Sequence, residues 1–192
     1  TADGTVAIGR SALAALTSGA GNTAVGYQAG DALVGGSANT ILGYQALSAE
    51  DGHGYNVAVG WKSLTAQDAG ANAANVAIGA NSGVAITTGV ENVAIGTHTL
   101  STATTALNNT AIGFDAMGDV KAGVAVDGCV AIGRNALLGN SSNTTDINGT
   151  VAVGTSALAA VTTGIGNTAV GFEALKTSVD GDKNTAIGYQ AL

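Results

Sequence analysis

The segment Asn22-Thr23-Ala24-Val25-Gly26 is one copy of a five-residue pattern, Asn-(Thr or Val)-Ala-(Val or Ile)-Gly, that recurs along the chain of 192 residues. Seven of the ten intervals between successive copies are 17 residues long, and the other three are 19, 20 and 21 residues long. Self-similarity at so regular a period indicates a solenoid, in which each coil stacks on the next. The copies end at Gly9, Gly26, Gly43, Gly60, Gly79, Gly96, Gly113, Gly133, Gly154, Gly171 and Gly188.

Each copy has the side-chain pattern of a short β-strand. The residue before the glycine is aliphatic in every copy, the residue two positions earlier is Val or Thr, and the residue between them is Ala except at Ile41. A period of two with β-branched residues is typical of a strand. The segment after the glycine, such as Tyr44-Gln45-Ala46-Leu47, leaves no room for a helix and is expected to form a second strand. The sequence therefore predicts an all-β fold: a parallel β-solenoid (β-roll) of about eleven 17-residue coils with two short strands each.

Residues 1–192 are expected to form a single repeat array. Larger insertions at residues 65–75, 118–129 and 138–150 should bulge from one edge without breaking the stack. The residue before the strand is Asn in eight copies, where stacked side-chain amides can hydrogen-bond to one another and to the turn backbone. This expected asparagine ladder consists of Asn22, Asn39, Asn56, Asn75, Asn92, Asn109, Asn167 and Asn184, and it is interrupted at Thr5, Cys129 and Thr150.

The two faces of the predicted strand differ in size, because one carries the aliphatic columns and the other carries alanine and glycine. If the small residues fill the coil, the aliphatic columns form an apolar stripe along the rod that is larger than monomers usually expose, which predicts a partner. The opposite packing would bury Val and Ile and leave a flat alanine ladder outside; the sequence leaves both open. The candidate subunit-interface residues are Ile8, Val25, Leu42, Val59, Ile78, Ile95, Ile112, Ile132, Val153, Val170 and Ile187.

The composition excludes several classes of protein. The chain has 30 glycines, no proline, one cysteine and a net charge of −7. A single cysteine excludes a disulfide scaffold. The six Lys and Arg residues are scattered singly, which argues against nucleic acid as a partner. No apolar run approaches the roughly 18 residues needed to span a bilayer, so membrane insertion is not expected.

Catalytic and metal-binding patterns are weak. The sequence has neither a Gly-x-Ser-x-Gly nucleophile elbow nor a phosphate-binding loop, so we expect no enzyme activity, no cofactor and no metal. We expect His53 and His98 to be exposed polar residues. The segment Asp180-Gly181-Asp182-Lys183-Asn184 begins like a calcium loop but lacks the glycine and glutamate at the sixth and twelfth positions, so an acidic turn is expected. Cys129 is expected to be a buried, inert thiol.

Aromatic residues gather in the column directly after the glycine. They could form a stacking platform for surface sugars, or they could pack over the edge of the roll and between subunits; we favour packing because the column is interrupted and no polar cluster accompanies it. The column contains Tyr27, Tyr44, Trp61, Phe114, Phe172 and Tyr189.

Two units, Asn22-Thr23-Ala24-Val25-Gly26-Tyr27-Gln28-Ala29 and Asn184-Thr185-Ala186-Ile187-Gly188-Tyr189-Gln190-Ala191-Leu192, resemble the 17-residue NTAIGYQAL repeats of phage tail-fibre and related surface-fibre proteins. The strands at 57–60 and 93–96 are similar to the VAIG strands of trimeric autotransporter adhesin heads. The resemblance implies a homotrimer with the aliphatic columns turned toward the threefold axis. It also implies a structural fibre segment for host-surface attachment, located in a virion or at a cell surface.

Two other functions compete with this interpretation. The closer one is a bacterial trimeric surface adhesin head, and the more distant one is an ice- or crystal-surface-binding solenoid, which the absence of a continuous Thr-x-Thr row disfavours. The expected partners are further copies of the chain, other fibre segments joined end to end, and cell-surface glycans or proteins. Because neither end of the sequence offers a capping element, we expect the chain to be a fragment of a longer fibre.

Overall fold

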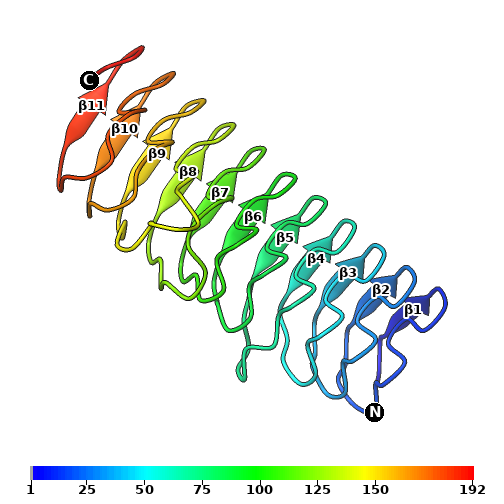
Figure 1. Ribbon diagram of the computed structural model, residues 1–192. Coiled ribbons are helices and arrows are strands. Elements are labelled where there is room, and N and C mark those ends of the chain that lie inside the picture. The colour runs from blue at the N-terminus through cyan, green and yellow to red at the C-terminus, as the bar shows by residue number, and fades with distance from the viewer. Residues whose placement is uncertain (1) are drawn as a thin grey trace.

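The computed structural model describes residues 2–192 and forms one parallel β-solenoid (Figure 1). Within this range eleven three-residue strands form a single sheet in chain order, which confirms the predicted fold class. Thr1, the first residue of the expected array, lies outside the described residues. The strands are β1 (Val6–Ile8), β2 (Thr23–Val25), β3 (Thr40–Leu42), β4 (Val57–Val59), β5 (Val76–Ile78), β6 (Val93–Ile95), β7 (Thr110–Ile112), β8 (Val130–Ile132), β9 (Val151–Val153), β10 (Thr168–Val170) and β11 (Thr185–Ile187).

Each strand pairs with its counterpart in the next coil without slipping. The register also continues across the longer coils, where Val57 lies opposite Val76, Thr110 opposite Val130, and Val130 opposite Val151. The insertions therefore leave the sheet intact, and the coils stack into a rod whose two ends carry β1 and β11 (Figure 1). At roughly 4.8 Å per strand, the stack is about 50 Å long.

The predicted second strand of each coil is wrong: across residues 2–192 the segment after the glycine forms a turn. Its second and fourth residues have positive φ, as at Gln45 (φ 51°) and Leu47 (φ 48°), whereas strands require negative φ. The turns still stack, because Gln45 N–H donates to Tyr27 O at 2.9 Å and Leu47 N–H donates to Ser63 O at 3.0 Å. Backbone hydrogen bonds thus join neighbouring coils on this side as well as in the sheet.

The interior of each coil is filled by alanine from the strand and by Ala, Ser or Thr and then Leu or Met from the turn. Ala58, Ser63 and Leu64 are all fully buried, for example. One irregularity shows how closely the interior packs. Gly30 replaces the turn leucine of its coil, and a Cβ there would lie 2.6 Å from Cδ1 of Ile41, the one strand residue that replaces an inward alanine. The larger Ile41 therefore fills the space that Gly30 leaves.

The asparagines before the strands form a buried hydrogen-bonded column between coils. The Oδ1 of Asn92 accepts hydrogen bonds from both N and Nδ2 of Asn109 at 3.1 Å, and its own Nδ2 donates to Ala106 O at 2.7 Å. The same bond from backbone N–H to the preceding Oδ1 joins Asn22 to Asn39 and Asn167 to Asn184. Each ladder amide therefore satisfies a buried backbone donor of the next coil.

Replacing Asn92 with alanine should destabilise the stack by about 3 kcal/mol, because it leaves the buried N–H of Asn109 and the carbonyl of Ala106 without their partners. The change in the free energy of unfolding can be measured by chemical denaturation. Asn184→Ala is the matched control, since its side chain is exposed in the last coil and should cost less than about 1 kcal/mol. Equal losses in the two variants would contradict a cross-coil role for the ladder.

Candidate functional site

The outer face of the sheet is apolar. The central alanine of each inner strand points into the coil, and the residues on either side of it point outward. Ala58 is fully buried, whereas Leu42 is 47% exposed and Ile78 is 38% exposed. Of the two packings that the sequence left open, the structure has the one with alanine inside, so the candidate interface residues lie on the surface of the single chain.

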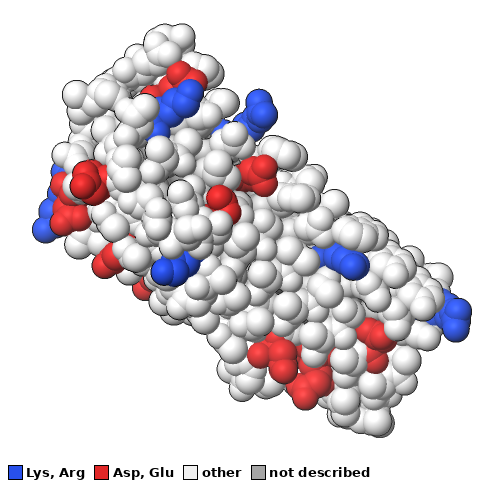
Figure 2. All heavy atoms as spheres, viewed as in Figure 1, with Lys and Arg blue, Asp and Glu red and all other residues white. Residues whose placement is uncertain are grey.

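This outer face continues along the whole rod. Every outward position of the eleven strands within residues 2–192 is Val, Thr, Ile or Leu, so no charged side chain interrupts it. In the space-filling view, charged side chains occur singly or in small groups separated by uncharged surface (Figure 2). A continuous exposed apolar surface of this kind is typical of a protein contact. We call it the aliphatic face.

A column of aromatic rings runs beside the aliphatic face. The rings of Tyr27 and Tyr44 stack with centroids 5.3 Å apart, Tyr44 and Trp61 with centroids 6.3 Å apart, and Phe172 and Tyr189 with centroids 5.3 Å apart. The rings of each pair are within 14° of parallel, so each ring covers a face of its neighbour. Because the stack occupies those faces, the rings mainly offer their edges to a partner.

A polar column follows the aromatic one and borders the apolar surface. Gln45 Nε2 donates to Gln28 Oε1 at 3.0 Å, and Gln190 Nε2 donates to Glu173 Oε2 at 2.8 Å. Lys176 and Gln190 lower the pKa of the Glu173 carboxyl by hydrogen bonding to its charged form. An apolar centre with a polar border is the usual arrangement of a protein interface.

The loops of the longer coils line a shallow open hollow. Asp127, Asp146, Asn148 and Lys183 contribute to it, and they come from the 118–129 and 138–150 insertions and the last turn. The acidic turn at 180–184 also stabilises the stack, because Asp182 Oδ1 accepts a hydrogen bond from Ile165 N–H at 2.9 Å. These loops are the most variable polar surface of the rod.

Cys129 takes the place of a ladder asparagine in its coil. Its N–H donates to Asn109 Oδ1 at 2.9 Å, and its thiol donates to Ile147 O at 3.0 Å. The side chain is buried, and burial raises the pKa of the thiol to about 11. The thiolate needed for nucleophilic attack is therefore scarce at neutral pH.

Cys129 should resist a thiol-alkylating reagent at pH 8 in the folded protein and react once the chain is unfolded. The raised pKa also has a consequence for stability: between the ordinary value of 9.0 and about 11, the unfolded chain loses a proton that the folded chain retains. Stability should therefore fall as the pH rises through this range, and the fall should be smaller in Cys129→Ala. Rapid labelling of the folded protein would contradict the buried position.

The two histidines differ in their surroundings. His98 is exposed as predicted, 3.2 Å from Asn81 Nδ2 and stacked on Phe114. His53 is partly buried and contacts the fully buried carboxylate of Glu50, which the sequence analysis did not single out. Glu50, Asp51, His53 and Asp68 form a group of side chains of metal-ligating type.

Comparisons with family models, with curated proteins and with solved structures found no match for the chain. Among residues 2–192 there is no helix of the length and apolarity that crossing a membrane requires. The geometry of the rod and its faces therefore provides the evidence about function.

Proposed function

We propose that the chain is a structural segment of an extended fibre, such as a phage tail fibre, that reaches a host surface. Three copies pack their aliphatic faces together around a common axis. The observation that carries this proposal is the aliphatic face itself: it is uncharged, it runs the length of the rod, and it faces away from the core.

A second copy of the chain is the partner whose surface fits this face best. The face repeats once per coil, so a partner must present side chains at the same spacing over about 50 Å to bury it. Another copy has that spacing by construction, and the insertions do not interrupt its strands. The number of three copies rests on the resemblance to trimeric fibre proteins. In such a trimer the edges of the stacked aromatic rings pack against the neighbouring subunit.

The proposed role of the segment is mechanical. Backbone hydrogen bonds join every coil to the next through the sheet, the turn and the asparagine ladder, so bending the rod would strain many bonds at once. Burial of the aliphatic faces would add the contacts that hold the chains parallel. The loops of the longer coils would then be displayed outward for cell-surface glycans or proteins, and other fibre segments would join at the ends.

The attachment role can be tested with fluorescently labelled protein and a panel of bacterial and mammalian cells. Saturable binding to bacterial cells is expected, and it should weaken when residues 140–147 are deleted, a change that should leave assembly intact. Saturable binding to mammalian cells or matrix alone would favour the adhesin-head alternative. Absence of saturable binding to every cell type would contradict an attachment role for this segment.

A further inference from the structure

Glu50 is a fully buried carboxylate at a position that is apolar in neighbouring coils. Three residues after the turn leucine, other coils bury Leu33, Ile86 or Val161, and the next coil buries Gln67. Gln67 is fully engaged, because it donates to Thr87 O and accepts from Asn75 Nδ2. A carboxylate in such a position requires compensation, since removing it from water is costly.

The compensation that the chain itself offers Glu50 is one-sided. Its Oε1 accepts hydrogen bonds from His53 N at 2.9 Å and Gly52 N at 3.3 Å, and it lies 2.9 Å from His53 Nδ1. Its Oε2 has no hydrogen-bond partner in the part of the chain that the structure describes. A buried oxygen without a partner is rare and calls for a ligand or water.

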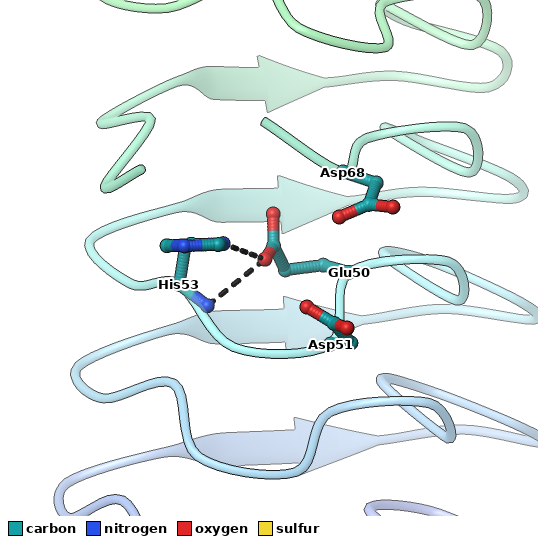
Figure 3. A group of neighbouring side chains, drawn as sticks. All are labelled: Glu50, Asp51, His53 and Asp68. Atoms are coloured by element: carbon teal, nitrogen blue, oxygen red, sulfur yellow. Dashed lines mark hydrogen bonds and ion pairs between the residues drawn. The ribbon is translucent and has the colours of Figure 1, made fainter. Parts of the chain in front are cut away.

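Two more carboxylates surround this pair. Asp51 lies next to Glu50 in the chain and Asp68 comes from the following coil, so the group joins two coils (Figure 3). One ligand atom from each of the four residues lies within 4.8 Å of the others. Three carboxylates face a single imidazole here, and among the described residues the one ion pair to this group is His53–Glu50. The excess negative charge favours a cation.

The backbone that carries these side chains is fixed by neighbouring coils. Asp51 O accepts a hydrogen bond from Gly35 N at 3.2 Å, His53 O accepts one from Asn39 Nδ2 at 3.2 Å, and Asp68 N donates to Thr87 O at 2.9 Å. The ligands therefore approach from a rigid frame, while the partly or fully exposed side chains of Asp51, His53 and Asp68 keep rotamer freedom. Closing a cation site would require only side-chain movement.

We propose that Glu50, Asp51, His53 and Asp68 bind one divalent transition-metal cation, of the Zn²⁺ or Mn²⁺ type. Oxygen donors alone would suit Ca²⁺ or Mg²⁺, but the imidazole favours the transition metals. The 2.9 Å separation of Nδ1 and Oε1 is close to the roughly 3.0 to 3.4 Å between adjacent ligand atoms at metal bonds of about 2.1 Å. The cation would take the place of the proton that these two atoms share.

The position of the site suggests what the cation does. The longer coil at 65–75 leaves Nδ2 of Asn56 without an acceptor among the described residues, so the ladder is weakest beside this site. A cation held by Glu50 and Asp68 ties the two coils together at that point. This role concerns a single rod and does not depend on the proposed trimer.

The test is a calorimetric titration of the intact chain, freed of metal by a chelator, with Zn²⁺ and Mn²⁺ separately. We expect one cation per chain, and Asp68→Asn and Glu50→Gln should each weaken binding at least about tenfold. Asp180→Asn, which removes an exposed carboxylate elsewhere, is the matched control and should leave the affinity unchanged. Thermal denaturation should show that Zn²⁺ raises the midpoint of the parent protein and not that of Asp68→Asn.

Two results would overturn the proposal. One is absence of saturable binding of either cation up to millimolar concentration, which would leave a hydrogen-bonded His53–Glu50 pair with water. The other is equal affinity in the parent, Glu50→Gln and Asp68→Asn, which would indicate adventitious binding to surface carboxylates only. Because Asp68 is exposed and no hydrogen bond of its side chain would be lost, its variant should fold even if the Glu50 variant does not.

Discussion

Replacing Ile95 with aspartate is expected to dissociate the assembly into single chains. Ile95 ends β6, near the middle of the rod, and its side chain lies on the aliphatic face. In the proposed trimer the substitution would bury an unpaired carboxylate from each of three chains close to a common axis. Such a charge typically costs 3 to 5 kcal/mol, about 4 kcal/mol per chain, and the three like charges repel one another. Sedimentation should show the mass falling to that of one chain.

Thr145→Asp is the matched control for this experiment. Thr145 is exposed in the 138–150 insertion, away from the sheet, so the same added charge should leave the mass of the assembly unchanged. Circular dichroism should be alike in both variants, because Ile95 does not fill the coil interior. An Ile95→Asp protein that keeps the parent mass would contradict the assignment of the aliphatic face as the subunit contact.

Replacing Gly96 with alanine should disrupt the stack within a single chain. Gly96 has φ +133°, and a Cβ placed on it would lie 2.6 Å from the carbonyl oxygen of Gly113 in the next coil. The neighbouring atom belongs to a backbone that is hydrogen-bonded on both sides, so it cannot move away cheaply. We expect a loss of about 4 kcal/mol in the free energy of unfolding, from backbone strain and from the clash together.

Gly188→Ala separates these two contributions. Gly188 has nearly the same backbone conformation, φ +134°, but it lies in the last coil, where the nearest atom to an added Cβ is 3.9 Å away. Its substitution should cost only the strain, about 1 to 2 kcal/mol. The denaturation midpoints of the two variants give the difference. Equal losses would show that the approach between coils does not restrict this position.

The solenoid could be predicted from the sequence because the repeat is regular enough to align every coil. The direction of the strand faces was harder, since alternation separates Ala24 from Val25 without saying which is inside. The turn leucines contained the missing signal. Residues such as Leu47 and Leu64 fill the coil, so only small side chains fit opposite them.

The second strand was mispredicted because apolar spacing reports burial and not φ. In the turn, Ala46 and Leu47 are both buried, yet they lie in a right-handed and left-handed alternation rather than an extended one. Gly30 and Gly83, which replace the turn leucine in two coils, both have φ +59°. Glycine at that position was the available sign of positive φ.

The cation site was missed because its residues come from two coils and include an acidic side chain in a segment expected to be a polar edge. Comparing Glu50 with Leu33 and Ile86, its counterparts in other coils, would have identified a buried charge. The spatial approach of Asp68 could not be inferred, because the longer coil at 65–75 obscures its register with Asp51.

The mass of the protein in solution tests the central proposal most directly. We expect sedimentation equilibrium to give three times the 18.3 kDa of the chain, with an elongated shape, and imaging to show threefold symmetry when the rod is viewed end-on. A stable monomer of 18.3 kDa at micromolar concentration would contradict the account, because the aliphatic face would then remain open to water.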